Sequence, residues 1–199
     1  MKNCEICEVE SSVGAVYDEE LREIYLTGVV DMDVYQNVVS AIHHLDQTRG
    51  NITLIINSKG GEVAAGQGIA DAIRLTKNKV IAHCFGECMS VAMTILQACD
   101  GRISAPNCRF MIHEVSGGVM EASVSDLKRY HAECESLNDS IKKDLAENSD
   151  LSLIEIDALC KAETFMSADV AMGYGFLDGI FGVCKKSMAK KPVSKKGKK

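Results

Sequence analysis

Short apolar runs alternate along residues 23–113 with longer stretches in which apolar residues recur at helical spacing. The runs are rich in β-branched residues and are typical of strands buried in a parallel sheet. They cover residues 23–30, 51–57, 79–85, 101–105 and 108–113. The stretches between them predict helices at residues 33–47, 62–76 and 89–98. Because strands joined through helices form right-handed crossovers, the alternation predicts an α/β fold built around a parallel sheet.

The pattern changes after residue 113. Residues 122–148 predict one long amphipathic helix, and a second helix near residues 153–161 leads to the segment 164–168. A short helix at residues 169–175 is then ended by glycine. A long helix with so much polar surface cannot bury both sides in one small domain, so we expect it to project and to pack against another copy of the chain. An ordinary surface helix is the alternative.

Length, apolar content and cysteine content limit the classes of protein to which this chain can belong. The 199 residues are most simply one domain with a tail. No apolar run approaches the ~20 residues of a membrane span, and the first residues lack the order of a secretory signal, so we expect a cytoplasmic protein. The nine cysteines predict free, buried thiols in a reducing compartment. Cys4 and Cys7 form a CxxC pair without a second ligand pair, so no metal site is predicted.

Charge is unevenly distributed along the chain. Residues 185–199 hold eight of the 22 Lys and Arg and no acidic residue, which leaves a net charge of −14 on the rest. We therefore predict a disordered Lys-rich tail at 185–199, either a solvated segment or a contact for acidic surfaces. The acidic body disfavours nucleic acid as the main partner. Residues 1–20 are polar and acidic and predict a weakly ordered segment before a folded domain at 21–184.

Ser90 and His113 each follow a predicted strand, and both are candidate catalytic residues. A strand–turn–helix junction can expose a serine hydroxyl and place the next backbone N–H beside it, with Gly86 permitting the turn. A histidine base must reach that hydroxyl and be oriented by a third group. On local sequence alone, a helix N-cap for Ser90 and a structural role for His113 remain open.

The Gly60–Gly61 pair ends a predicted central strand and opens a helix. Without side chains, the pair allows the backbone of a ligand to approach, and its N–H groups can hold an oxyanion. The segment fits neither phosphate-binding loop pattern, GxxxxGK[ST] or GxGxxG. A plain strand–helix turn without a function is the alternative.

Four segments together carry a resemblance to a known family. They are 55–61 (IINSKGG), 86–92 (GECMSVA), 106–113 (PNCRFMIH) and 165–178 (FMSADVAMGYGFLD). In this order and spacing they resemble the successive motifs of the Clp protease proteolytic subunit family, a serine peptidase family. The similarity runs from about residue 23 to residue 182.

The resemblance implies a ClpP/crotonase-type fold of stacked ββα units, with the long helix as a projecting handle. It implies a serine endopeptidase with Ser90 as nucleophile and His113 as base. The oxyanion donors would be the backbone N–H groups of Gly61 and Val91, and a peptide would pair along the Gly60–Gly61 strand. It implies no metal or organic cofactor, a peptide or unfolded-protein substrate, and a homo-oligomer of stacked rings, with heptamers as the expectation. An ATP-dependent unfoldase is the expected partner.

Three positions depart from the family pattern. Lys59 stands where the family has proline before the two glycines. The triad acid, usually Asp, corresponds to Glu163, with Asp169 as the reserve candidate. Glutamate there is similar to the Clp-like proteases of bacteriophages, which process capsid proteins. The segment before the first strand does not match the family's axial loops, which bears on docking to an unfoldase.

Two other functions remain compatible with the sequence. A crotonase-like acyl-CoA enzyme would share the core fold and a pair of oxyanion N–H groups, but would not need Ser90 and His113. A non-catalytic ring subunit would serve assembly alone. The presence of both Ser90 and His113 disfavours a non-catalytic subunit, whereas Glu163 in place of the usual Asp is compatible with one.

Overall fold

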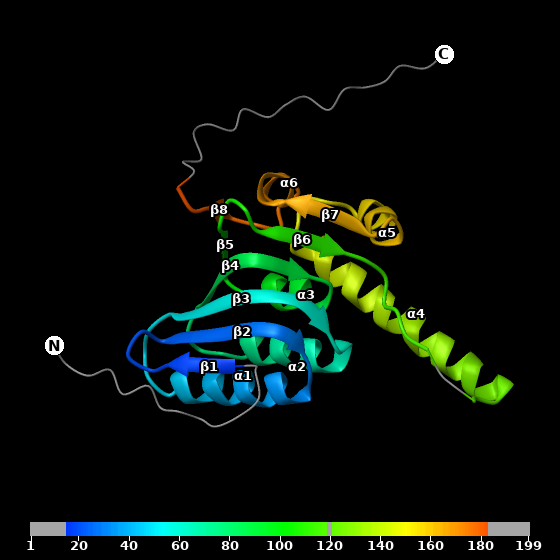
Figure 1. Cartoon of the computed structure of the whole chain (residues 1–199), viewed down its shortest axis with the longest axis horizontal. Coiled ribbons are helices and arrows are strands. Elements are labelled where there is room, and N and C mark those ends of the chain that lie inside the picture. The colour runs from blue at the N-terminus through cyan, green and yellow to red at the C-terminus, as the bar shows by residue number, and fades with distance from the viewer. Residues whose placement is uncertain (1–14, 119–120, 183–199) are drawn as a thin grey trace, which may run out of the picture.

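The computed structural model describes residues 15–118 and 121–182 as an α/β domain (Figure 1). Its described strands are β1 (Ala15–Asp18), β2 (Glu23–Val30), β3 (Ile52–Gly61), β4 (Val80–Met89), β5 (Gly101–Ser104), β6 (Arg109–Ile112), β7 (Thr164–Ser167) and β8 (Gly179–Ile180). Its described helices are α1 (Met32–Leu45), α2 (Val63–Arg74), α3 (Val91–Gln97), α4 (Val124–Glu147), α5 (Leu153–Lys161) and α6 (Ala168–Gly173).

The sheet runs in the order β1-β2-β3-β4-β5-β8. All pairings from β2 to β8 along this path are parallel, as the alternation of strands and helices predicts. The strand β4 splits its pairing, because its first half pairs with β5 and its last residues pair with β6. This split moves β6 beside the carboxyl end of β4, which is where Ser90 follows.

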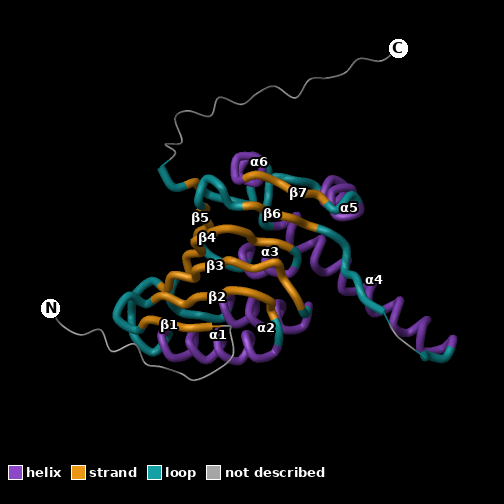
Figure 2. The backbone as a smooth tube through the Cα atoms, viewed as in Figure 1, coloured by secondary structure: helices purple, strands orange, loops and turns teal. Residues whose placement is uncertain are grey.

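Two antiparallel pairings were not predicted. The first joins β1 to β2, and β1 lies in the stretch 1–20 that was expected to be weakly ordered. The second joins β6 to β7, a ribbon flanked by α5 and α6 (Figure 2). The rest of the predicted N-terminal segment, residues 1–14, and the Lys-rich tail 185–199 lie outside the described residues.

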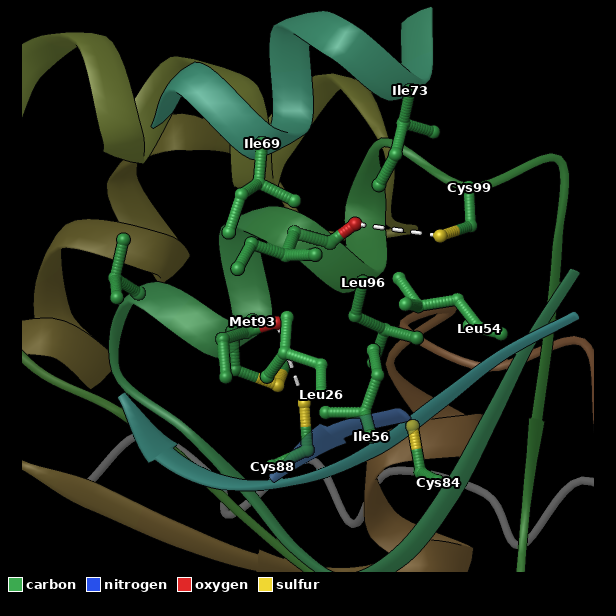
Figure 3. Packing of buried hydrophobic residues seen from close by; sticks show 14 of the residues in the cluster. Leu26, Leu54, Ile56, Ile69, Ile73, Cys84, Cys88, Met93, Leu96 and Cys99 are labelled. Atoms are coloured by element: carbon green, nitrogen blue, oxygen red, sulfur yellow. Dashed lines mark hydrogen bonds between the residues drawn. The ribbon is translucent and has the colours of Figure 1, made fainter. Parts of the chain in front are cut away.

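The core lies between the sheet and the helices α1, α2 and α3. Strand residues of alternating burial supply one side of it, and Figure 3 shows Leu26 and Ile56 pointing toward Met93 and Leu96 of α3. Each fully buried aliphatic side chain of this kind contributes about 1.5–3 kcal/mol. The N-cap residue of α1 is Asp31, whose side chain accepts a hydrogen bond from Val34 N–H.

The predicted free thiols are confirmed for the described cysteines. Five are buried and Cys134 is partly buried, and none forms a disulfide. In the core, Cys88 and Cys99 donate S–H bonds to helix carbonyls, drawn as dashed lines in Figure 3. Burial raises the pKa of both thiols. Cys4, Cys7 and Cys184 lie outside the described residues.

The long helix α4 projects from the domain, as predicted. Its N-terminal part extends away from the sheet (Figure 1), and the buried residues of the helix, Lys142 and Leu145, both lie near its C-terminal end. Ser123 and Asp126 close a capping box at its start, which stabilises an end that gains little from packing. Apolar side chains such as Val124 and Leu127 stay exposed on the projecting part.

Candidate active site

Ser90 and His113 meet at the carboxyl edge of the sheet. The Oγ of Ser90 lies 2.7 Å from Nε2 of His113, within hydrogen-bond distance. The serine joins β4 to α3 with φ 54° and ψ −129°, a conformation that costs a non-glycine residue about 1–3 kcal/mol. Its side chain makes no helix-capping bond, although it occupies the N-cap position. The geometry therefore disfavours a capping role and leaves the hydroxyl of a strained, partly buried serine facing the His113 ring.

The pairing of β4 with β6 brings the two residues together. Met89 pairs with Met111 in parallel, and the N–H of Ser90 donates to the Met111 carbonyl at 2.9 Å. Ser90 and His113 thus follow the same ends of neighbouring parallel strands. This edge of an α/β sheet is where ligands bind as a rule.

Gly60 and Gly61 are the last residues of β3 rather than a turn after it. A Cβ on Gly60 would lie 2.7 Å from Ser90 Cβ and 3.1 Å from the N of Val91. A Cβ on Gly61 would lie 2.2 Å from the Val30 carbonyl oxygen. Both positions exclude a side chain, so the backbone of β3 lies directly against the serine and the start of α3 at Gly60, and against Val30 of β2 at Gly61.

Ser58 holds this glycine segment in place, and sequence reasoning missed it. Its buried hydroxyl donates to the Gly28 carbonyl at 2.6 Å and accepts from the Gly60 N–H at 3.0 Å. These bonds fix the strand end without the proline that Lys59 replaces. The Lys59 side chain is exposed and lies 4.0 Å from Glu87. Gly86, expected to shape the turn before Ser90, lies within β4 at φ 66°, where a Cβ would strike Asn57.

A pocket of about 260 Å³ opens beside the Ser–His pair. Gly61 at the end of β3, Val91 at the start of α3 and His113 after β6 line it. Ile141 and Leu145, near the end of α4, line it as well. Polar residues such as Lys59 and Ser116 line it too, but the apolar Ile141 and Leu145 can contact an apolar side chain that lies next to the serine hydroxyl.

The β6–β7 ladder shows which candidate for the third group comes nearest to His113. Ile112 pairs with Thr164, so His113 and Glu163 are the next residues opposite each other. Residues paired in a ladder have Cβ atoms about 5 Å apart, and His113 and Glu163 lie one step beyond the last pair. Glu163 is exposed with φ 48°, so the ladder does not set its side-chain direction. In the described part of the chain, the hydrogen bond found for the His113 ring is the one to Ser90, so Glu163 as the acid stays a prediction.

The reserve acid, Asp169, lies at the opposite end of the same ladder. Ser167 pairs with Arg109, four residues before His113, and strands rise about 3.3 Å per residue. Asp169 is exposed in the first turn of α6, beyond this pair. It is therefore separated from the imidazole by roughly the length of β6, and the register favours Glu163 over it.

An ion-pair cluster beside the site was not predicted. The ammonium of Lys142 lies 2.8 Å from a carboxylate oxygen of Glu114 and 2.8 Å from one of Asp157. Burial lowers the pKa of Lys142, but its hydrogen bonds to Asp157 and Glu114 outweigh burial, so the pKa is raised. In the sequence, Lys142 lies on α4 between the apolar residues Ile141 and Leu145. This position was the one indication that the lysine could be buried.

No group of three or more His, Cys, Asp or Glu side chains that could hold a metal ion occurs within residues 15–118 and 121–182. No helix in those ranges is long and apolar enough to cross a membrane.

The fold and this arrangement define an α/β protein with a Ser–His pair of the serine-hydrolase type. The family model described as Clp protease matches residues 8–183. The chain is also 31% identical over 167 residues to the ATP-dependent Clp protease proteolytic subunit 2 of Pseudomonas aeruginosa, covering 82% of this chain and 83% of that protein. The chain belongs to the Clp protease family, as its motifs and fold indicate.

Proposed function

We propose that this protein is a serine endopeptidase that cleaves peptide bonds in peptides or unfolded proteins. The observation that carries the proposal is the 2.7 Å contact between Ser90 Oγ and His113 Nε2, at a strained serine beside the glycine end of β3. Membership of the Clp protease family supports the same reaction class.

In the proposed reaction, an extended substrate lies along the end of β3 and pairs with the backbone at Gly60–Gly61. One apolar substrate side chain enters the pocket lined by Ile141 and Leu145. His113 Nε2 takes the Ser90 proton as Oγ attacks the scissile carbonyl carbon. The N–H groups of Gly61 and Val91 stabilise the oxyanion, and the N–H of Val91, as the first residue of α3, has no partner within its helix.

The tetrahedral intermediate collapses when His113 returns the proton to the leaving amine. The acyl group stays on Ser90 until water, deprotonated by the same imidazole, releases it. Glu163 orients the imidazole and stabilises its protonated form. No step requires a metal ion or an organic cofactor.

We also propose that the active form is a homo-oligomer of stacked rings, in which α4 packs against α4 of another copy. The exposed apolar residues Val124 and Leu127 on a projecting helix support this arrangement. The relative's name, an ATP-dependent proteolytic subunit, suggests an ATP-driven unfoldase as partner. Ring size and this partner are separate parts of the proposal.

The test is peptidase activity of the full chain on fluorogenic peptides, together with fluorophosphonate labelling of the serine. We expect Ser90→Ala to lose both, while the mass of the assembly in solution stays unchanged. Cleavage by Ser90→Ala at the parent rate would show that the nucleophile is another residue. Turnover of CoA thioesters without labelling would instead favour the crotonase-like enzyme.

A non-catalytic ring subunit is the second candidate, because the Glu163 carboxylate makes no hydrogen bond to His113 in the described part of the chain. This candidate expects no activity and no labelling from the pure protein. It also expects mixed rings with an active subunit. Co-assembly with an active Clp subunit, measured by native mass spectrometry, separates the two.

A further inference from the structure

Lys142 is the one buried charged residue among those the structure describes, with 7% of its surface exposed. It lies on α4, but its ammonium contacts two other parts of the chain. Glu114 directly follows His113, and Asp157 lies on α5. One buried ammonium therefore joins the segment after β6, the long helix and α5.

The two carboxylates that Lys142 holds belong to the segments that carry the proposed base and acid. Glu114 is the neighbour of His113, and α5 ends at Lys161, two residues before Glu163. A second contact ties the same segment to the helix, since Val115 N–H donates to Asn138 Oδ1 of α4 at 2.7 Å. The segment after β6 is thus anchored to α4 at two consecutive residues.

The backbone ladder does not fix the base and the acid. The β6–β7 pairing ends at Ile112 and Thr164, one residue before His113 and one residue after Glu163. Glu163 has already left the extended conformation, with φ 48°. The distance between the two side chains therefore depends on what holds the segments beyond the ladder, and Lys142 bonds to both of them.

We propose that Lys142 is a positioning residue of the active site, which sets the distance between His113 and Glu163 by bridging Glu114 and Asp157. The inference rests on the proposed peptidase function. Lys142 is not among the residues that line the pocket beside Ser90, so it acts through the two segments and not on the substrate.

Removal of the bridge has a specific kinetic signature. Without the ammonium, Glu114 loses its ion-pair partner and Asp157 keeps only the exposed Lys161, so nothing holds the two carboxylates together and the segments carrying His113 and Glu163 separate. A misplacement of about 1 Å in a catalytic group lowers the rate by up to about a hundredfold. Because Lys142 itself does not line the pocket, we expect the loss to fall mainly on kcat, with a smaller change in KM through Val115 and Ser116, which do line it.

The first comparison is Lys142→Met against Lys142→Arg and Lys143→Met. Met keeps the length of the side chain without its charge, whereas Arg can still donate to two carboxylates. Lys143 is exposed on the same helix and is the matched control. We expect a tenfold to hundredfold lower kcat for Lys142→Met, substantial rescue by Lys142→Arg and parent values for Lys143→Met. Fluorophosphonate labelling of Ser90 should slow in the same order.

A triple variant separates positioning from folding. Glu114→Gln, Lys142→Met and Asp157→Asn together remove the bridge without leaving a buried unpaired charge, since Lys161, which loses Asp157, is exposed to solvent. This chain should therefore fold even where Lys142→Met alone does not. We expect it to keep the parent unfolding midpoint within a few degrees and still show the low kcat. Parent kcat in the folded triple variant would overturn the inference and leave the peptidase proposal intact. A parent chain without activity and without Ser90 labelling would overturn both.

Discussion

Gly60 lies against Ser90 so closely that a methyl group on the glycine would be 2.7 Å from the serine Cβ. The same methyl would lie 3.1 Å from the Val91 nitrogen, one of the two proposed oxyanion donors. The absence of a side chain at Gly60 therefore places the end of β3, the nucleophile and the start of α3 in direct contact. This contact joins the strand that would bind the peptide to the residue that would cleave it.

Gly60→Ala should consequently abolish peptidase activity and destabilise the fold by about 1–3 kcal/mol, because its φ of 91° and the contact with Ser90 both oppose a Cβ. Activity and the urea midpoint measure the two effects. Gly173→Ala is the control, since a Cβ there meets nothing within 4 Å. An active Gly60→Ala enzyme would contradict the close packing of β3 on Ser90.

Thr94→Val should stabilise the protein. Thr94 Oγ1 is buried without a hydrogen-bond partner in the described part of the chain, and such a hydroxyl costs about 1–3 kcal/mol. Valine keeps the shape and removes the polar atom, so we expect a gain of about 1 kcal/mol. Ser104→Ala is the comparison, because that buried hydroxyl donates to the Ala105 carbonyl and its removal should cost stability. Urea unfolding at one fixed protein concentration measures both, and a loss in Thr94→Val would indicate a partner for the hydroxyl.

Local sequence patterns predicted the elements whose burial is periodic, such as α1 and β2, and placed Ser90 and His113 after strands. They missed β1, because its residues lie in a polar, acidic stretch and are ordered by pairing with β2. They also ended β3 before Gly60–Gly61, because glycine pairs usually mark turns, whereas here the neighbouring strands demand glycine. Lys142 could not be placed from sequence, since its partners are 28 and 15 residues away.

The Lys142 bridge should stabilise the fold only where its groups are charged. Hydrogen bonds from Lys142 and Lys161 lower the pKa of Asp157 below 3.8. The contribution of Asp157 to the free energy of unfolding is therefore present above pH 3.8 and is lost as pH falls through the lowered pKa. The pKa of Lys142 is raised above 10.5. Its contribution to the free energy of unfolding is therefore complete below pH 10.5 and is lost as pH rises through the raised pKa. We expect the stability difference between parent and Lys142→Met to be flat from about pH 5 to 9 and to shrink at both extremes. A constant difference at pH 3 would contradict the bridge, with urea unfolding as the measurement.

The described thiols should differ sharply in reactivity. Burial raises the pKa of Cys108 to about 12 and that of Cys160 to about 11, so neither is a thiolate near neutral pH. Cys134 on α4 is partly exposed and should be alkylated first among the six. Peptide mapping after brief iodoacetamide treatment at pH 8, with and without urea, resolves each cysteine. Rapid native labelling of Cys108 would show that β6 opens locally.

Two substitutions, Glu163→Gln and Asp169→Asn, show which of the two carboxylates orients His113. If Glu163 orients His113, Glu163→Gln leaves the shape and removes the charge that stabilises the imidazolium, so kcat should fall by about a thousandfold or more. Glu163→Asp restores the charge on a side chain one methylene shorter and should recover part of the rate. Asp169→Asn should stay within about twofold of the parent, because Asp169 lies beyond Ser167, which pairs with Arg109 at the far end of β6. The reverse result, a large loss in Asp169→Asn with an active Glu163→Gln, would move the acid to α6. Parent rates in both variants would mean that the Ser90–His113 pair works without a carboxylate from either position.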